Sequence, residues 1–295
     1  MLISHLHAAS RQPLSLLALA IAIAAGSTAA QARPACATAE ACVQDILAAA
    51  RAGKDIEQYQ TIARLKSIAG RPPGRPGIYR ASAEERRQLA LSHLKAGRHH
   101  EAEQLLRSAL ATLPTYPDFW NHLAVALQVQ GKTDEAVSAL VAAHFWSPAP
   151  AETARGYDRL ANDKAFGGQH YRVAADAIAA NAAAAASVDA TLPPVAQAGA
   201  RVSGRTDARI DFDSCRRPDY PALALDTEAQ GTVELAYYID ATGKPLRVKT
   251  LRSSGHPALD NEVITTLSAC SFRPAMQGDL PVGSWTKLQY VWSIE

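Results

Sequence analysis

Four cysteines are the residues whose chemistry depends most on their surroundings: Cys36, Cys42, Cys215 and Cys270. An even, small number of cysteines suits two disulfides if the protein folds in an oxidising compartment. Cys36 and Cys42 stand six positions apart and could pair with each other. The alternative is a metal site, but metal binding needs converging ligands, and no His stands at a CxxC-like spacing. We therefore expect no metal and no cofactor.

Nine histidines could suggest an enzyme. His99 and His100 fall at a predicted turn, His93 and His122 on predicted helices, and His256 in a predicted loop. None of them belongs to a metal-ligand or catalytic-triad motif.

Two other sequence patterns bear on whether the protein has a catalytic or phosphate-binding site. Ser253-Ser254-Gly255 lacks the Gly-x-Ser-x-Gly frame of a nucleophile elbow and reads as a strand-to-helix turn with a serine cap. There is no GxxxxGK[ST] phosphate loop. The sequence therefore predicts a protein without catalytic residues.

Composition excludes a further class of function. The apolar fraction is 48%, the charged fraction is 20% and the formal net charge is +2, which is ordinary for a folded domain and provides no field to attract nucleic acid. Residues 211–295 carry 8 Lys or Arg against 11 Asp or Glu. We expect no nucleic-acid binding.

The amino terminus has the layout of a secretory signal peptide. Arg11 precedes an apolar run from Leu14 to Ala25, and Ala30-Gln31-Ala32 offers a small–x–small cleavage site. We expect residues 1–32 to be removed and the mature chain to reside in the periplasm. The alternative is an uncleaved inner-membrane anchor, but the run of about a dozen residues is shorter than the roughly 20 that span a bilayer.

Helical patterns fill the first half of the chain. Residues 33–77 predict a helical amino-terminal segment in which Thr38 caps a helix, Gly53 ends it and a proline-rich loop follows. Two copies of one pattern then occupy 83–150, each pair of matching residues being 34 positions apart. Leu89, Ala90, Gly97, Ala102, Leu106, Ala109 and Pro114 recur as Leu123, Ala124, Gly131, Ala136, Leu140, Ala143 and Pro148.

This period and these residue types resemble the tetratricopeptide repeat, with Trp120 at the family's first aromatic position. The resemblance implies paired helices that turn at the glycines and cross closely at the small alanines. Capping helices are expected in 151–186 and a flexible Pro-, Ala-, Gly- and Ser-rich linker in 187–210. The repeat's inner face implies a groove lined by Glu84, Arg87, Leu91, Lys95, Asp118, Asn121, Val125 and Gln128.

Strand patterns begin after Asp211. A short helix is expected over Pro218–Ala224, alternating strands over Gly231–Ile239 and Trp285–Ile294, and a strand over Leu246–Arg252. An amphipathic helix is expected over Pro257–Ala269.

The order of the expected elements and the sequence motifs in residues 211–295 resemble the carboxy-terminal domain of the TonB family. The residues that carry the resemblance are Tyr220-Pro221, Gly231-Thr232-Val233, Gly243, Ser253-Ser254-Gly255, Leu259-Asp260, Phe272-Arg273-Pro274-Ala275 and Trp285. The fold class implied is α+β in two domains: the helical repeat array, then a small domain whose helices pack on a three-stranded antiparallel sheet. The resemblance also implies that Cys215 pairs with Cys270, as in some members of the family.

The resemblance implies a partner as well. Members of the family take up an extended segment of an outer-membrane receptor alongside the final strand, whose unpaired N–H and C=O groups the segment satisfies. The residues expected to form this edge are Thr286, Lys287, Leu288, Gln289, Tyr290, Val291, Trp292, Ser293 and Ile294. Alternatively, another element or a second copy covers the edge, which would give a homodimer.

Two functions follow from these resemblances. The first is a periplasmic TonB-family protein that binds outer-membrane receptors in energy-coupled transport. A transducer resembling TonB has a full membrane-spanning helix followed by a long proline-rich segment. This chain has a short apolar run and helical repeats in their place. The resemblance therefore does not imply that this chain transmits force. The alternative is an envelope scaffold that holds one partner in the repeat groove and another on the sheet.

Overall fold

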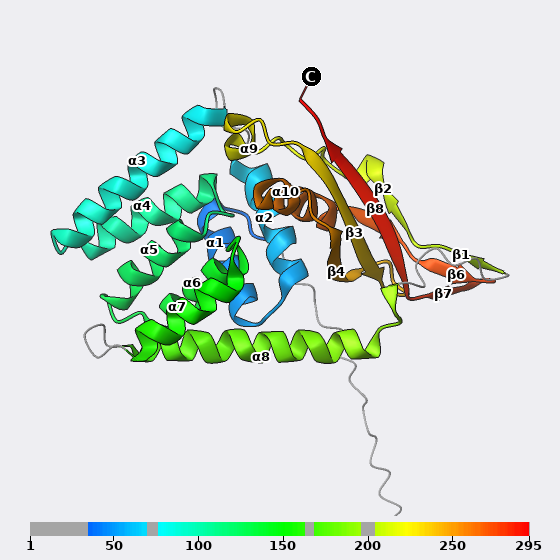
Figure 1. The fold of residues 1–295 in the computed structure, drawn as a ribbon, viewed down its shortest axis with the longest axis horizontal. Helices are drawn as coiled ribbons and strands as arrows, with labels where there is room; N and C mark the ends of the chain where they lie inside the picture. The colour runs from blue at the N-terminus through cyan, green and yellow to red at the C-terminus, as the bar shows by residue number, and fades with distance from the viewer. Residues whose placement is uncertain (1–34, 70–75, 163–167, 196–203, 295) are drawn as a thin grey trace, which may run out of the picture. The chain divides into compact units, whose positions relative to one another are not determined.

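The computed structural model describes residues 35–69, 76–162, 168–195 and 204–294 (Figure 1). The predicted signal peptide, residues 1–32, lies outside the described residues. Among the residues that are described, no helix combines the length and apolar character that crossing a membrane requires.

Two helices open the described chain, as the sequence predicts. Helix α1 spans Ala39–Arg51, and the side chain of Thr38 caps it by accepting a 3.1 Å hydrogen bond from the amide of Ala41. Gly53 ends the turn with a φ of 64°, and α2 spans Asp55–Ala69. The Cys36–Cys42 disulfide ties the start of α1 to the segment before it.

The two repeats are two helix pairs. Helices α3 (Pro76–Lys95) and α4 (His99–Thr112) form the first, and α5 (Pro117–Gln128) and α6 (Thr133–Phe145) the second. Gly97 and Gly131 adopt φ values of 74° and 75° in the two turns, a conformation that favours glycine. The alanines of the predicted crossings are all buried, namely Ala90, Ala102, Ala124 and Ala136.

Helix α3 begins before the predicted start of the first repeat at Ala83. The loop predicted over 71–77 is wrong at residues 76 and 77, because α3 already starts at Pro76, and proline is well tolerated in a first helical turn, where no intrahelical amide bond is lost. Residues 71–75 of that loop lie outside the described residues. His99 and His100 likewise belong to the first turn of α4 and not to the preceding loop.

Neighbouring helices complete the core of the array. Helix α1 packs against α6 and α4, whereas α7 (Pro150–Asn162) and α8 (Gln169–Thr191) pack against α6 and each other. The predicted capping helices in 151–186 are therefore present, and α8 extends beyond them. Repeat stacks need such neighbours because each helix pair leaves an apolar face open.

The interpretation of 187–210 as a flexible linker needs correction. Residues 187–191 continue α8, and 205–211 contain the short strands β1 (Arg205–Thr206) and β2 (Arg209–Asp211). The alanine-rich part of α8 before them favours helix, and the ion pairs of Asp189 with Arg247 and Lys249 hold this end of α8, so residues 187–191 continue the helix although their own composition suggests a linker. The central part of the predicted linker, 196–203, lies outside the described residues.

The carboxy-terminal domain contains the expected three-stranded antiparallel sheet. Its strands are β3 (Gly231–Ile239), β4 (Pro245–Arg252) and β8 (Ser284–Trp292), in the order β4-β3-β8. Helix α10 (Pro257–Ser268) packs on β3. Short strands complete the domain: β1 pairs with β6 (Ala275–Gln277), β6 with β7 (Leu280–Val282), and β2 with β5 (Ser271–Arg273).

The first helix of this domain is shorter than predicted. Helix α9 spans only Ala222–Asp226, because Pro221, with a φ of −64° and a ψ of 140°, is extended and precedes it. The Cys215–Cys270 disulfide, expected from the family resemblance, is present with a Cα–Cα distance of 4.9 Å.

Two hydrophobic cores underlie the two domains, and α2 touches both. Ile56 is buried in the core of the sheet domain, and Tyr59 packs against both clusters. Burial raises the pKa of Tyr59, so this hydroxyl stays protonated at any physiological pH. The side chain of Gln60 donates a 3.0 Å hydrogen bond to the carbonyl of Ser268 on α10, and Lys66 pairs with Glu262 on the same helix.

Candidate functional site

The final strand is the first candidate site. All nine residues of β8 pair with β3 in one continuous register, from Trp292 opposite Gly231 to Ser284 opposite Ile239. Within the described part of the chain β8 pairs with β3 alone. No strand among the described residues therefore satisfies the backbone donors and acceptors along the outer edge of β8.

Side chains of β8 alternate between the two faces of the sheet. Thr286, Leu288 and Tyr290 are half-buried on the face that α10 covers, whereas Lys287, Gln289 and Val291 are exposed on the other. This agrees with the alternation read from the sequence. The core-facing residues are only half-buried because their outer side has no neighbouring strand.

The expected strand was Trp285–Ile294, whereas β8 spans Ser284–Trp292. It therefore starts one residue earlier and ends two residues earlier than expected. Ser293 and Ile294 of the predicted edge lie beyond its last paired residue, Trp292. The amide of Ile294 instead donates a 3.4 Å hydrogen bond to the side chain of Gln230.

An aromatic cluster closes the carboxyl end of β8. Trp292 makes edge-to-face contacts with Tyr220 and Tyr290, at centroid distances of 4.8 and 4.9 Å. Tyr220 precedes α9 and donates from its hydroxyl to the carbonyl of Ala229. Tyr220, one of the residues that carry the family resemblance, thus helps to fix the carboxyl end of the edge strand.

The opposite edge of the sheet differs from β8. Strand β4 begins with a proline, its pairing with β3 is interrupted by two register shifts, and it lies against α2. Arg247 pairs with Asp55 at 3.1 Å and with Asp189 at 2.9 Å, and Lys249 pairs with Asp189 at 3.1 Å. Bulges, proline and charges are the usual ways of protecting an edge from strand addition. Only β8 offers a long and regular edge among the described strands.

The Ser-Ser-Gly turn takes part in a hydrogen-bond network and does not form the predicted cap. The amide and hydroxyl of Ser254 both donate to Oδ1 of Asp260, at 2.9 and 2.7 Å, and Ser253 donates to the same carboxylate. The N-cap of α10 is His256, whose side chain makes no capping bond. The expectation of a serine cap is therefore wrong: the serines hold the turn through Asp260 instead.

The repeat groove is the second candidate site. Glu84, Arg87, Leu91 and Lys95 lie on α3 and Asp118, Asn121, Val125 and Gln128 on α5, and the two helices are in contact. Arg87 forms an ion pair with Glu84, and its hydrogen bond lowers the pKa of Glu84.

Asn121, a third residue of this set, also contacts another part of the chain. Asn121 accepts a 2.8 Å hydrogen bond from the hydroxyl of Tyr157 on α7. His122 stands beside the groove, and burial followed by the nearby Arg87 lowers the pKa of its imidazole. The helical pattern predicts His122 only as a residue of a repeat helix, and no sequence motif marks it as a site residue.

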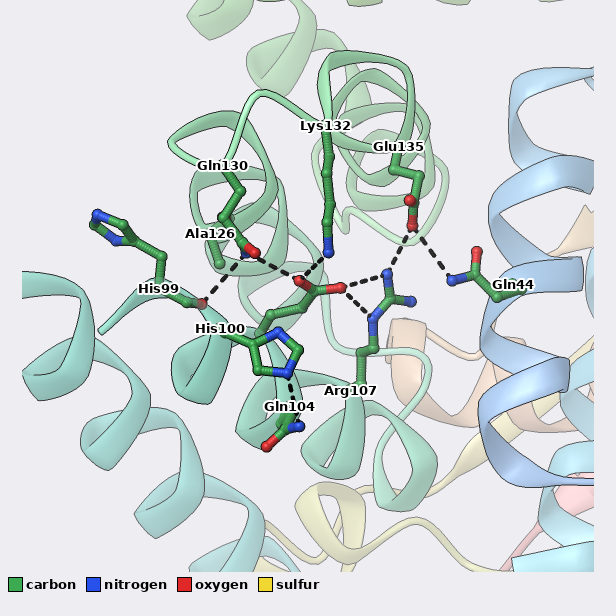
Figure 2. A network of polar contacts seen from close by, with 10 residues as sticks. Gln44, His99, His100, Gln104, Arg107, Ala126, Gln130, Lys132 and Glu135 are labelled. Carbon is green, nitrogen blue, oxygen red and sulfur yellow. Dashed lines mark hydrogen bonds and ion pairs between the residues drawn. The ribbon is translucent and has the colours of Figure 1, made fainter. Parts of the chain in front are cut away.

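A polar network between the repeats was also not anticipated (Figure 2). Glu103 on α4 is only 5% exposed and accepts hydrogen bonds from Arg107 at 2.9 Å, Gln130 at 2.9 Å and Lys132 at 2.7 Å. Burial alone would raise its pKa, but these three donors lower it. Arg107 also donates a hydrogen bond to Glu135, and Gln44 on α1 donates to the same carboxylate. The four-residue spacing of Glu103 and Arg107 on one helix was the only local signal for this network.

A pocket with a volume of about 360 Å³ lies where the repeat loops meet α9 and α10. Tyr116 and Trp146 line it from the repeats, His256 from the N-cap position before α10 and Asn261 from α10 itself. None of the residues that line it carries a formal charge apart from the titratable His256.

The described chain is thus a stack of helix pairs followed by a small α+β domain with one open strand edge. Residues 216–294 match the family model of the Gram-negative bacterial TonB protein C-terminal domain, and residues 93–151 match a tetratricopeptide repeat model. The chain therefore carries a TonB C-terminal domain behind tetratricopeptide repeats.

Curated relatives match the same region. Protein tonB2 of Pseudomonas aeruginosa is 37% identical over 71 residues, which are 24% of this chain and 26% of that protein. Protein TonB of Neisseria meningitidis serogroup C is 32% identical over 76 residues, 26% of this chain and 24% of that protein. The chain thus spans about a quarter of the length of the curated relatives it matches. No solved structure matches it.

Proposed function

We propose that this protein binds an extended segment of a protein partner along the outer edge of β8, and that outer-membrane receptors of energy-coupled transport are its partners. The observation that carries the proposal is the contrast between the two edges of the sheet. Nine residues of β8 pair without a register shift and leave their outer edge open, whereas β4 is interrupted, proline-started and tied to the helices. The similarity to proteins named TonB supports the choice of partner.

We further propose that the protein acts in the periplasm after residues 1–32 are removed. The two disulfides agree with an oxidising compartment. Mass spectrometry of the amino terminus in cells tests this: a chain that begins at Arg33 is expected, and an intact Met1 in the membrane fraction would establish an anchor instead. No catalytic activity and no cofactor are part of the proposal.

The binding experiment uses the full mature chain and proline substitutions in β8. Along β8, successive backbone amides point alternately towards β3 and towards the open edge. Proline has no backbone N–H, so one of the two substitutions, Leu288→Pro or Gln289→Pro, removes an amide from the open edge. The other substitution removes a hydrogen bond between β8 and β3. Thermal unfolding identifies the variant that keeps its fold. That variant should lose capture of TonB-dependent receptors, or of peptides from their periplasmic segments.

Two results would contradict the proposal. The first is unchanged capture by the folded proline variant. The second is recovery of no receptor by the unaltered protein.

A scaffold function is the second candidate, and the open α3–α5 face favours it. Arg87→Ala with Lys95→Ala should then remove an envelope partner that Leu288→Pro or Gln289→Pro leaves bound. If both kinds of variant lose the same partner, the groove and the edge serve one function. If the groove variant loses nothing, the scaffold reading fails.

A further inference from the structure

The side chains of β8 restrict which polypeptide can pair with it; this inference rests on the proposed function. Lys287 is the only charged residue between Ser284 and Trp292, and it is exposed. Directly opposite it on β3 stands Ala236, which offers no carboxylate. No described residue forms an ion pair with Lys287 within 4.0 Å, whereas Arg247 and Lys249 on the other edge are both paired.

The opposite face of β8 sets a different requirement. Leu288 and Tyr290 are half-buried, and their neighbours on β3, Leu235 and Val233, are 1% and 0% exposed. A strand added to β8 would place alternate side chains beside Leu288 and Tyr290. Apolar residues there would extend the core outward, because each removes further apolar surface from water.

We propose that β8 selects an extended segment with apolar residues at alternate positions and an acidic residue on the other face, opposite Lys287. Opposite charges directly across two strands attract, and like charges repel. An unpaired lysine on an open edge also discourages pairing with arbitrary strands. Selectivity of this kind requires a penalty for the wrong partner as well as a gain for the right one, and one lysine supplies both.

A second copy of the chain is a poorer occupant of this edge. Two β8 strands that pair along their whole length about a two-fold axis are centred on Leu288. In that arrangement Lys287 stands opposite Gln289 of the second copy, which carries no charge. A heterologous strand with a carboxylate satisfies Lys287, whereas self-pairing does not.

The test uses three synthetic ten-residue peptides that alternate Val and Thr and differ only at one central Thr-face position, which holds Glu, Gln or Lys. Binding to the mature protein is followed by calorimetry at low salt. We expect the Glu peptide to bind about two- to fivefold more tightly than the Gln peptide, and the Lys peptide to bind more weakly than both. The preference should shrink in 1 M salt, where the Debye length is about 3 Å.

Charge reversal provides the control. Lys287→Glu should invert the order of the Glu and Lys peptides, whereas Lys244→Glu, an exposed reversal in the β3–β4 turn, should leave it unchanged. If all three peptides bind equally and the proline variant still abolishes binding, the selectivity inference is wrong and edge pairing stands. If no peptide binds, edge pairing itself is refuted. The protein could instead form a concentration-dependent dimer that all three peptides dissociate equally. That result would show that a second copy of the chain occupies the edge.

Discussion

Asp189, near the carboxyl end of α8, accepts a 2.9 Å hydrogen bond from Nε of Arg247 on β4. The same guanidinium reaches Asp55 at the start of α2, so one side chain of the sheet domain holds two helices of the array. Burial, only partly offset by Arg247, raises the pKa of Asp55, whereas Arg247 and Lys249 lower the pKa of Asp189 despite some burial. This cluster is one reason that β4 is unavailable as a second edge.

Removing the shared cation should therefore destabilise the chain. We expect Arg247→Met to lower the free energy of unfolding by about 2 kcal/mol, since two partly buried carboxylates lose a charged hydrogen-bond donor. Arg155→Met, on the exposed surface of α7, is the matched control and should change stability by less than about 0.5 kcal/mol. Urea unfolding measures both. Equal effects of the two variants would show that the cluster contributes nothing.

Acid should weaken the repeats through Glu103. Its pKa in the folded protein lies below the ordinary 4.5, so the unfolded chain binds a proton first as the pH falls. The stabilisation is present above pH 4.5 and is lost as the pH falls through the folded pKa. Glu103→Gln should be less stable at neutral pH and should show a shallower loss between pH 5 and pH 3.5. Urea midpoints across this range test it, and parallel curves for both proteins would argue against a role for Glu103.

The two disulfides should differ in what they contribute. They close segments of 55 and 6 residues, and loop entropy predicts about 4 and about 2 kcal/mol. Cys215→Ser with Cys270→Ser should therefore cost more stability than Cys36→Ser with Cys42→Ser. Thermal unfolding of the two double variants gives the comparison, and the reverse order would be inconsistent with a loop-entropy origin.

Glycine at the start of β3 should be required. Gly231 has a φ of 155°, and a Cβ there would stand 2.6 Å from the carbonyl oxygen of Ser254. Gly231→Ala should cost about 1–3 kcal/mol and loosen the pairing with Trp292. Gly156→Ala, where a Cβ meets nothing within 4 Å, should instead gain about 0.5–1 kcal/mol because it lies inside α7. Denaturant titrations compare the two, and a Gly231→Ala protein as stable as the parent would exclude the steric argument.

Local residue patterns were sufficient to predict most of the helices and strands. The 34-residue period located both helix pairs, and the glycines and small alanines that it marked are the turns and the close crossings. Alternation located β3 and β8 and assigned Leu288 and Lys287 to opposite faces. These features are encoded by residues within a few positions of one another, so a pattern is enough to reveal them.

Which residues of these elements remain free to contact a partner depends on long-range contacts that the sequence pattern does not reveal. Asp189 is bound to Arg247 across 58 residues, Asn121 accepts a hydrogen bond from Tyr157, and Glu103 accepts hydrogen bonds from Gln130 and Lys132 in the α5–α6 turn. None of these partners lies in the local sequence around the residue that it contacts. The composition of 187–191 suggested a linker, although α8 continues through it. An open strand edge is likewise defined by which neighbours are absent, and that depends on how the whole chain packs and not on the strand's own residues.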